Sequence, residues 1–165
     1  MNLRRLYRTI ESFASDRFGT DKELLKHVLN EIVKSPDIKI KGGRIWEFEP
    51  KALSYRLFHQ IGHIERIEAR YRLPVDYPAF QWLADQRSII ANETEPSLRR
   101  VGILKFAATG VGERVSTKHG SFPPYVLAFN ADELDQSLLA DLNIISVAVT
   151  SSLRGQKIEQ KDKEM

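Results

Sequence analysis

The chain has 165 residues, of which 42% are hydrophobic and 28% charged. This composition is enough for one hydrophobic core and a charged surface, so it favours a single folded domain and excludes a disordered or fibrous protein. The chain has no cysteine, which excludes disulfides, thiolate metal ligands, a cysteine nucleophile and a thioether-bound cofactor. The net charge of +3 is too small to indicate nucleic-acid binding.

The sequence also argues against a membrane protein. No apolar run approaches the ~20 residues that a membrane-spanning helix needs. The positively charged start, Met1 to Arg5, is not followed by the apolar stretch of a secretory signal. We therefore expect a cytoplasmic protein that binds neither nucleic acid nor membrane.

Two helices are predicted at the start of the chain. Apolar residues recur at helical spacing over residues 3–18, and Gly19 is expected to end this helix. Thr20 and Glu23 form a capping-box pattern, which predicts that a second helix begins at residue 21. Ser35-Pro36 is expected to end it.

A β-hairpin should follow, with strands at 44–48 and 54–61. In its second strand, simple alternation places one set of side chains on a common face: Tyr55, Leu57, His59 and Ile61. Further along, we expect a short helix over 79–88, strands at 88–91, 101–107 and 125–129, a turn at 109–112 and a mobile loop tip at 116–121. The last and longest helix is expected from residue 133 to about residue 157.

This order of elements predicts an α+β fold. Hairpins and short connections favour antiparallel pairing, and the alternation of strand and helix that marks a parallel sheet is missing. The N- and C-terminal helices carry wide apolar stripes, so we expect them to pack on one face of an antiparallel sheet.

Three stretches in this order resemble the GAF domain, a small-molecule sensing module similar in shape to the PAS domain. They are Leu24 to Ile32, like the opening helix of such domains, Gly43 to Phe48, like the first strand, and Phe129 to Leu142, like the last strand leading into the closing helix. The resemblance covers residues 20–154. It implies a ligand pocket on the sheet face away from the terminal helices, dimerisation through those helices, and control of an attached output domain.

The resemblance also bears on the ligand. Family members that bind cyclic nucleotides often carry an Asn-Lys pair and, later, Phe, three residues and Asp-Glu. Here only two residues separate Phe129 from Asp132-Glu133, and no Asn-Lys pair matches. A cyclic nucleotide thus stays a candidate with an incomplete motif. Covalent bilin attachment and methionine sulfoxide reduction both use cysteines in this family, and the chain has none.

Four residues are the candidates for ligand contacts. Phe106 and Tyr125 are strand aromatics that could line a pocket, although aromatic residues more often belong to a core. Trp82 lies in the short helix that would roof a GAF pocket. Arg114 follows Gly110-Val111-Gly112, which a plain turn explains better than a phosphate-binding loop, because no helix follows it.

No pattern indicates an enzyme or a metal site. His59 and His63 are four residues apart, but a strand end and Gly62 make surface or hydrogen-bonding histidines the better interpretation. The carboxylates of Glu93 and Glu95 lie in a polar loop, where solvation explains them. Ser121 lacks the flanking glycines of a nucleophile elbow.

We divide the chain into an N-terminal connector helix (1–19), a GAF-like domain (20–154) and a charged linker or tail (155–165). The helix before Gly19 is additional to a minimal domain. Its apolar stripe could pack back on the sheet of its own chain or meet the same stripe of a partner chain. A homodimer interface is predicted from two terminal stripes: Leu3, Leu6, Ile10 and Phe13, with Leu142, Val149 and Leu153. The function expected is a non-enzymatic sensor; the alternative is a dimerisation module without a small ligand.

Overall fold

A computed structural model describes residues 3–15, 20–36, 38–64, 66–68, 70–91, 105–131 and 134–153. The described elements, in chain order, are α1 (Leu3–Ser15), α2 (Asp21–Val33), β1 (Ile40–Glu49), β2 (Ser54–Gly62), β3 (Arg72–Pro74), α3 (Pro78–Asp85), β4 (Ser88–Ala91), β5 (Lys105–Val111), β6 (Val115–Thr117), β7 (Gly120–Phe122), β8 (Tyr125–Ala131) and α5 (Ser137–Ser152).

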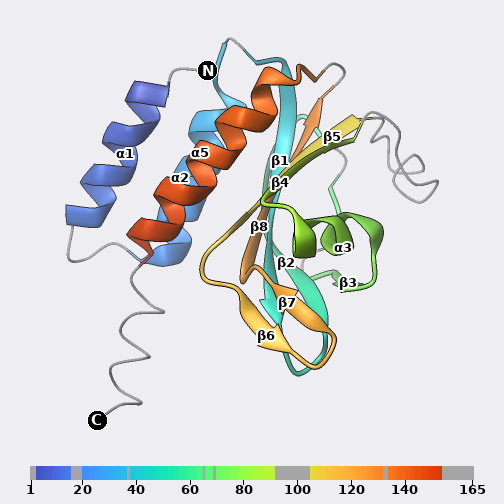
Figure 1. Cartoon of the computed structure of the whole chain (residues 1–165). Coiled ribbons are helices and arrows are strands. Elements are labelled where there is room, and N and C mark those ends of the chain that lie inside the picture. Colours follow the sequence, from blue (N-terminus) through green and yellow to red (C-terminus); the bar gives the residue numbers. More distant parts are fainter. Residues whose placement is uncertain are drawn as a thin grey trace.

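An antiparallel sheet with the strand order β3-β2-β1-β8-β5-β4 organises the described part of the chain. Helices α1, α2 and α5 lie on one side of it, and α3 lies on the other with the β6–β7 hairpin (Figure 1). We call these the helical face and the outer face. The predicted α+β class, with the terminal helices on one face of an antiparallel sheet, is confirmed.

The helical face is built in two layers. Helices α2 and α5 contact the sheet, and α1 packs on α2 and α5 rather than on strands. Helix α2 begins as predicted, because the Thr20 hydroxyl accepts from the Glu23 amide while the Glu23 carboxylate accepts from the Thr20 amide. Gly43 allows the close approach of α2 to β1, since a Cβ there would lie 2.7 Å from a Leu29 methyl.

Several predicted boundaries differ from the structure. Thr109 to Val111 continue strand β5 instead of forming a turn, because they pair with Tyr125 to Leu127 of β8. The predicted mobile tip at 116–121 is instead part of the β6–β7 hairpin. Helix α5 begins at Ser137, later than expected. Predictions for residues 16–19, 92–104 and 154–165 lie outside the described residues.

A β-bulge in strand β2 changes which side chains share a face. Leu57 pairs with Trp46, whereas His59 pairs with Ile45, so Phe58 is an extra residue in the register. Trp46 belongs to the core of the outer face and Ile45 to that of the helical face. His59 therefore does not share the face of Leu57, which corrects the simple alternation predicted for this strand.

The apolar stripes of the terminal helices are buried inside the chain. Leu6 and Ile10 of α1 are each 3% exposed, and they join the core between the helices and the sheet. The same core holds Leu142, Val149 and Leu153 and contacts Leu3. The five buried side chains have no surface to offer a partner, which corrects their assignment to an interface. The side chain of Phe13 lies outside the described residues.

Candidate functional site

One half of the outer face is closed by aromatic packing. Tyr55 stacks on Phe80 of α3 with the ring centroids 4.1 Å apart, and Phe48 lies 5.4 Å from Phe122 of β7. The Tyr55 hydroxyl donates to the Pro123 carbonyl at 2.7 Å. Burial raises the pKa of Tyr55 well above its usual value, and the charge of Arg114 acts in the opposite direction. This aromatic half is a packed core under α3.

Arg114 fastens the edge of that aromatic half. Its guanidinium group donates to the Ala84 carbonyl at 2.6 Å, and to those of Gln86 and Ser121 at 3.4 Å each. Arg114 thereby ties the end of α3 to strand β7. Trp82 is on the same helix and is 42% exposed, so it lies at the surface of α3 and does not enter the packed core.

The other half of the outer face is polar. Arg44 of β1 lies opposite Gln60 of β2 and opposite Ala128 of β8, and Gly42 lies opposite Asn130. Alternation along the strands places Arg44 on the face of Trp46, and Asn130 on the face of Val126 and Ala128. Three polar side chains from adjacent strands, Arg44, Gln60 and Asn130, thus share one end of the outer face. We call it the polar end.

Two of the three side chains of the polar end are buried, and the third, Gln60, is half-buried. Arg44 is 3% exposed and Asn130 is 7% exposed. The Gln60 amide is held in place, because it donates to the Ile67 carbonyl at 2.8 Å and accepts from the Ile67 amide at 3.2 Å. The Asn130 Nδ2 group has no hydrogen-bond partner among the described residues. A buried amide donor without a partner costs about 1–3 kcal/mol, so this position favours an acceptor atom beside it.

The four sequence-predicted ligand residues do not meet at one site. Phe106 lies directly opposite Asn130 across the β5–β8 ladder and is buried on the outer face, so it borders the polar end. Trp82 and Arg114 lie at α3. Tyr125 packs against the core of the helical face, beside Phe58 at a centroid distance of 6.2 Å. Tyr125 therefore points away from any site on the outer face.

Sequence reasoning missed Arg44 and Asn130. The signal was present in part, because Arg44 alternates with Trp46 and Phe48 and so occupies an inward position of its strand. Asn130 likewise continues the apolar run of β8. A polar residue at an inward strand position is the pattern that indicates a site, but the partner strand must be known to bring the two residues together.

Hydroxyl groups join the sheet to α5. The Ser88 and Thr109 hydroxyls lie 2.8 Å apart, and the Ser146 hydroxyl of α5 donates to the Gly110 carbonyl. The Gly112 amide donates to the Thr150 hydroxyl at 2.9 Å. Ser146 and Thr109 are fully buried. These contacts fix the position of α5 along β5, the strand that also carries Phe106.

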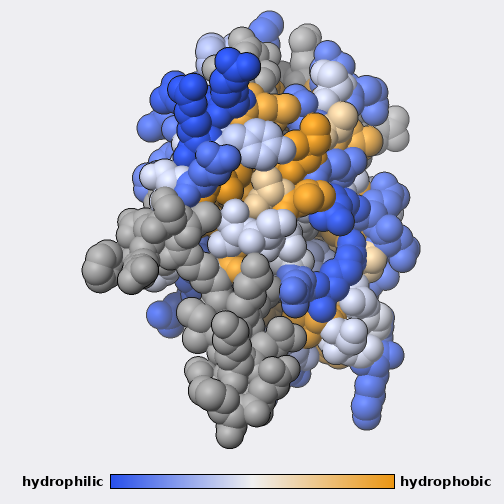
Figure 2. All heavy atoms as spheres, turned by 60° about the vertical axis from the view of Figure 1, so that its left-hand side comes forward, coloured by the Kyte–Doolittle hydropathy of each residue, from blue (hydrophilic) through white to orange (hydrophobic). Residues whose placement is uncertain are grey.

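The outward side of the helices presents an apolar patch. Tyr7 of α1 and Ile144 and Val147 of α5 are 39%, 41% and 51% exposed. They border a shallow hollow of about 500 Å³ together with Arg87 and Asn143. Figure 2 shows hydrophobic atoms gathered on this side of the molecule. We call Tyr7, Ile144 and Val147 the helix patch.

Within the described ranges, no group of three or more His, Asp or Glu side chains is placed to hold a metal ion. The helices in the same ranges include none that combines the length and the apolar character of a membrane span.

Comparison with known proteins identifies the fold. No protein-family model matches the sequence, and no curated protein matches it. Among solved structures, the GAF domain of a phosphoenolpyruvate-protein phosphotransferase from Coxiella burnetii is 11% identical, with a TM-score of 0.68 over 100% of this chain and 98% of that one. The corresponding domain from Acinetobacter is 11% identical, with a TM-score of 0.65 over 92% of this chain and 93% of that one.

An enzyme is also among the structural neighbours. The free methionine-R-sulfoxide reductase from Neisseria meningitidis is 11% identical, with a TM-score of 0.66 over 90% of this chain and 86% of that one. At such identities the likeness concerns the fold and not the activity. The antiparallel sheet, the terminal helices on one face and these neighbours together show that the chain folds as a GAF-like domain.

Proposed function

We propose that the protein is a regulatory sensor module that binds a small polar ligand at the polar end of the outer face. One observation carries the proposal: the buried Asn130 Nδ2 donor has no partner among the described residues. A ligand acceptor, such as a carboxylate or carbonyl oxygen, would satisfy this donor. Arg44 adds a positive charge beside it, and Phe106 supplies an apolar wall.

The signal would pass from the polar end to α5. Asn130 and Phe106 face each other on β8 and β5, and β5 carries Gly110, which accepts from Ser146. A ligand can shift α5 from one position to another only if it binds the protein more tightly in one of the two arrangements. The coupling free energy of such a shift is typically ~1–3 kcal/mol. An output domain joined after residue 154 would read the position of α5. The GAF neighbours taken from phosphotransferases support such an attachment.

We further propose that the protein acts as a homodimer through the helix patch. Tyr7, Ile144 and Val147 are apolar and exposed, whereas the stripe first expected at the interface is buried. On α5 the outward positions Ala140, Ile144, Val147 and Ser151 recur at the spacing of a helix–helix seam and include no charged residue.

The ligand proposal is tested by native mass spectrometry of the freshly purified chain. The expected result is an additional mass on the wild-type chain that is absent from Asn130→Ala. Asn30→Ala, which removes the same amide from the surface of α2, is the matched control and should keep the mass. If Asn130→Ala and the wild type carry the same mass, the ligand does not contact the polar end and the proposal fails.

The dimer is tested separately by light scattering. Ile144→Lys introduces a charge into the helix patch and is expected to give a monomer. Gln136→Lys, at the start of the same helix, should leave the dimer unchanged. If the wild-type chain is still monomeric at a protein concentration of about 100 μM, the dimer is weaker than that concentration would detect and this interface is refuted.

A second candidate function is an interaction module without a small ligand. The packed aromatic half favours it, because the protein's own side chains fill that part of the outer face. In this case the wild-type chain forms the dimer, carries no additional mass, and gains no thermal stability from small carboxylates or amides. The same two experiments therefore separate the two functions.

A further inference from the structure

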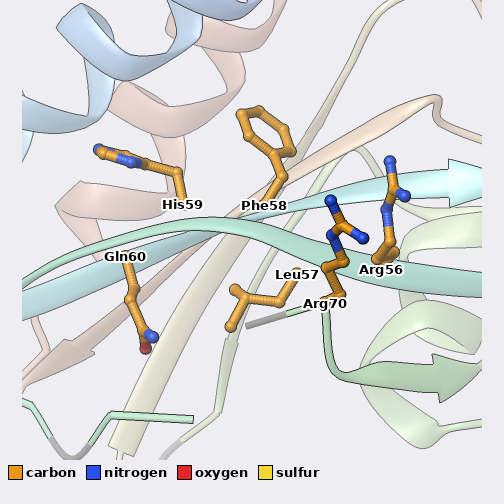
Figure 3. A pocket seen from close by; sticks show the side chains of 6 residues that line it. All are labelled: Arg56, Leu57, Phe58, His59, Gln60 and Arg70. Atoms are coloured by element: carbon orange, nitrogen blue, oxygen red, sulfur yellow. The ribbon is translucent and has the colours of Figure 1, made fainter. Parts of the chain in front are cut away.

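A second pocket opens beside the helical face and shares one lining residue, Gln60, with the polar end. It is an open pocket of about 400 Å³ along strand β2, and it includes Arg56, Phe58, His59 and Arg70. Figure 3 shows these four side chains directed to one side of β2, toward the helices, while Leu57 and Gln60 point to the other side. The bulge at Phe58 produces this grouping, because it brings His59 to the side of Arg56. We call this pocket the β2 groove.

The β2 groove lies in a basic stretch of the chain. Residues 51–72 contain five Lys and Arg and two Glu, a net charge of +3 that equals the net charge of all 165 residues. Lys26 of α2 adds a further positive charge near His59. Among the described residues, no carboxylate forms an ion pair with Lys26, Arg66 or Arg70.

Arg56 shares its two carboxylate partners, Glu47 and Glu49, with other cations. Glu47 is closer to Lys22, at 3.0 Å, than to Arg56, at 3.4 Å. Glu49 is 3.0 Å from Arg72 and 3.7 Å from Arg56. Three cations therefore share two carboxylates, and Arg56 makes the longest contact with each. Its charge, like that of Arg70, is directed into the groove (Figure 3).

We propose that the β2 groove binds the oxyanion of a phosphorylated small molecule. Two guanidinium groups on one side of a pocket suit a phosphate, because planar N–H donors form paired, charge-assisted hydrogen bonds with its oxygens. The volume of about 400 Å³ lies within the range of small-molecule pockets. The wall contributed by Phe58 gives an apolar surface to the organic part of the ligand.

His59 adds a pH-dependent part to this site. Burial lowers the pKa of His59, and the charges of Lys26 on α2 and of Arg66 after β2 lower it further. Arg56 on its own strand and Arg70 add to the positive surroundings, as does Lys22 of α2. A bound anion opposes these charges and raises the pKa of His59. By linkage, anion affinity rises as pH falls through the titration of His59.

The test uses pyrophosphate as the probe and the full chain as the protein, in calorimetry at low salt. Arg70→Gln is expected to weaken binding about tenfold, which is the loss of one charged hydrogen-bond pair. Arg8→Gln, an exposed arginine of α1, is the control for overall charge and should bind as the wild type does. Equal weakening in both variants, or no binding by the wild type, would overturn the proposal.

Two readouts make the result specific. Pyrophosphate should raise the pKa of His59 measured from its imidazole resonances, and an unchanged His59 titration would overturn the site. Asn130→Ala should bind pyrophosphate normally, so failure of the polar-end ligand and failure of this site are distinguishable. A glutamate-rich peptide that binds the groove more tightly than pyrophosphate would replace the small-molecule proposal with an acidic protein partner.

Discussion

Replacing Leu6 with alanine tests the position of α1 most directly. Leu6 is 3% exposed and lies in the core that α1 shares with α2 and α5. If the side chain packs inside the chain, its loss must lower the free energy of unfolding of the single chain. If it met a partner, as the sequence first suggested, its loss would instead weaken association.

The magnitude follows from the burial. Leucine to alanine removes three carbons, and each buried methylene contributes ~0.8 kcal/mol on transfer from water. A remaining cavity would add to this loss. The main contacts of helix α1 are with helices α2 and α5 and not with the sheet. Helix α1 can therefore shift inward and reduce the cavity left by the missing Leu6 side chain. We therefore expect a loss of about 2–3 kcal/mol.

Urea unfolding at two protein concentrations, ten times apart by design, measures this value. The loss for Leu6→Ala should be equal at both concentrations. Glu11→Ala, at an exposed position of the same helix, should change the unfolding free energy by less than about 0.5 kcal/mol. A Leu6→Ala chain as stable as the wild type, or a loss that grows on dilution, would refute the packing of α1 inside the chain.

Three further predictions concern other contacts. Thr20→Ala removes the capping box of α2 and should cost about 1 kcal/mol in urea unfolding; a change near zero would contradict the capping role. Ser146→Ala leaves the Gly110 carbonyl without its donor and should cost about 1–3 kcal/mol, while exposed Ser137→Ala should cost less. Because the pKa of His59 is lowered in the folded chain, stability should fall as pH drops below about 6.5, its unfolded value. His59→Gln should lessen that fall, and an unaltered pH profile would contradict the assignment.

The sequence predicted the local elements well where short-range chemistry decides them. Thr20 and Glu23 are three residues apart, so their capping box could be recognised without any tertiary information. The apolar run of β8 and the hairpin strands β1 and β2 were also identified, and with them the α+β class. The four proposed ligand residues were chosen by residue type and position in the chain, and the structure places only Phe106 beside the polar end.

The remaining features depend on which segments meet. An apolar stripe shows that a helix face is buried against something. The sequence around Leu6 and Ile10 could not indicate whether that face packs on a partner chain or on helices α2 and α5 of the same chain. The polar end needed the pairing of β1 with β8, since Arg44 and Asn130 are far apart in the chain. The β2 groove needed the bulge at Phe58, since one extra residue reverses the faces of all that follow. Sequence alone thus determined helix caps, strands and charge, because these follow from neighbours along the chain. The tertiary structure decided the buried stripe, the polar end and the β2 groove, because each is made by contacts between distant segments.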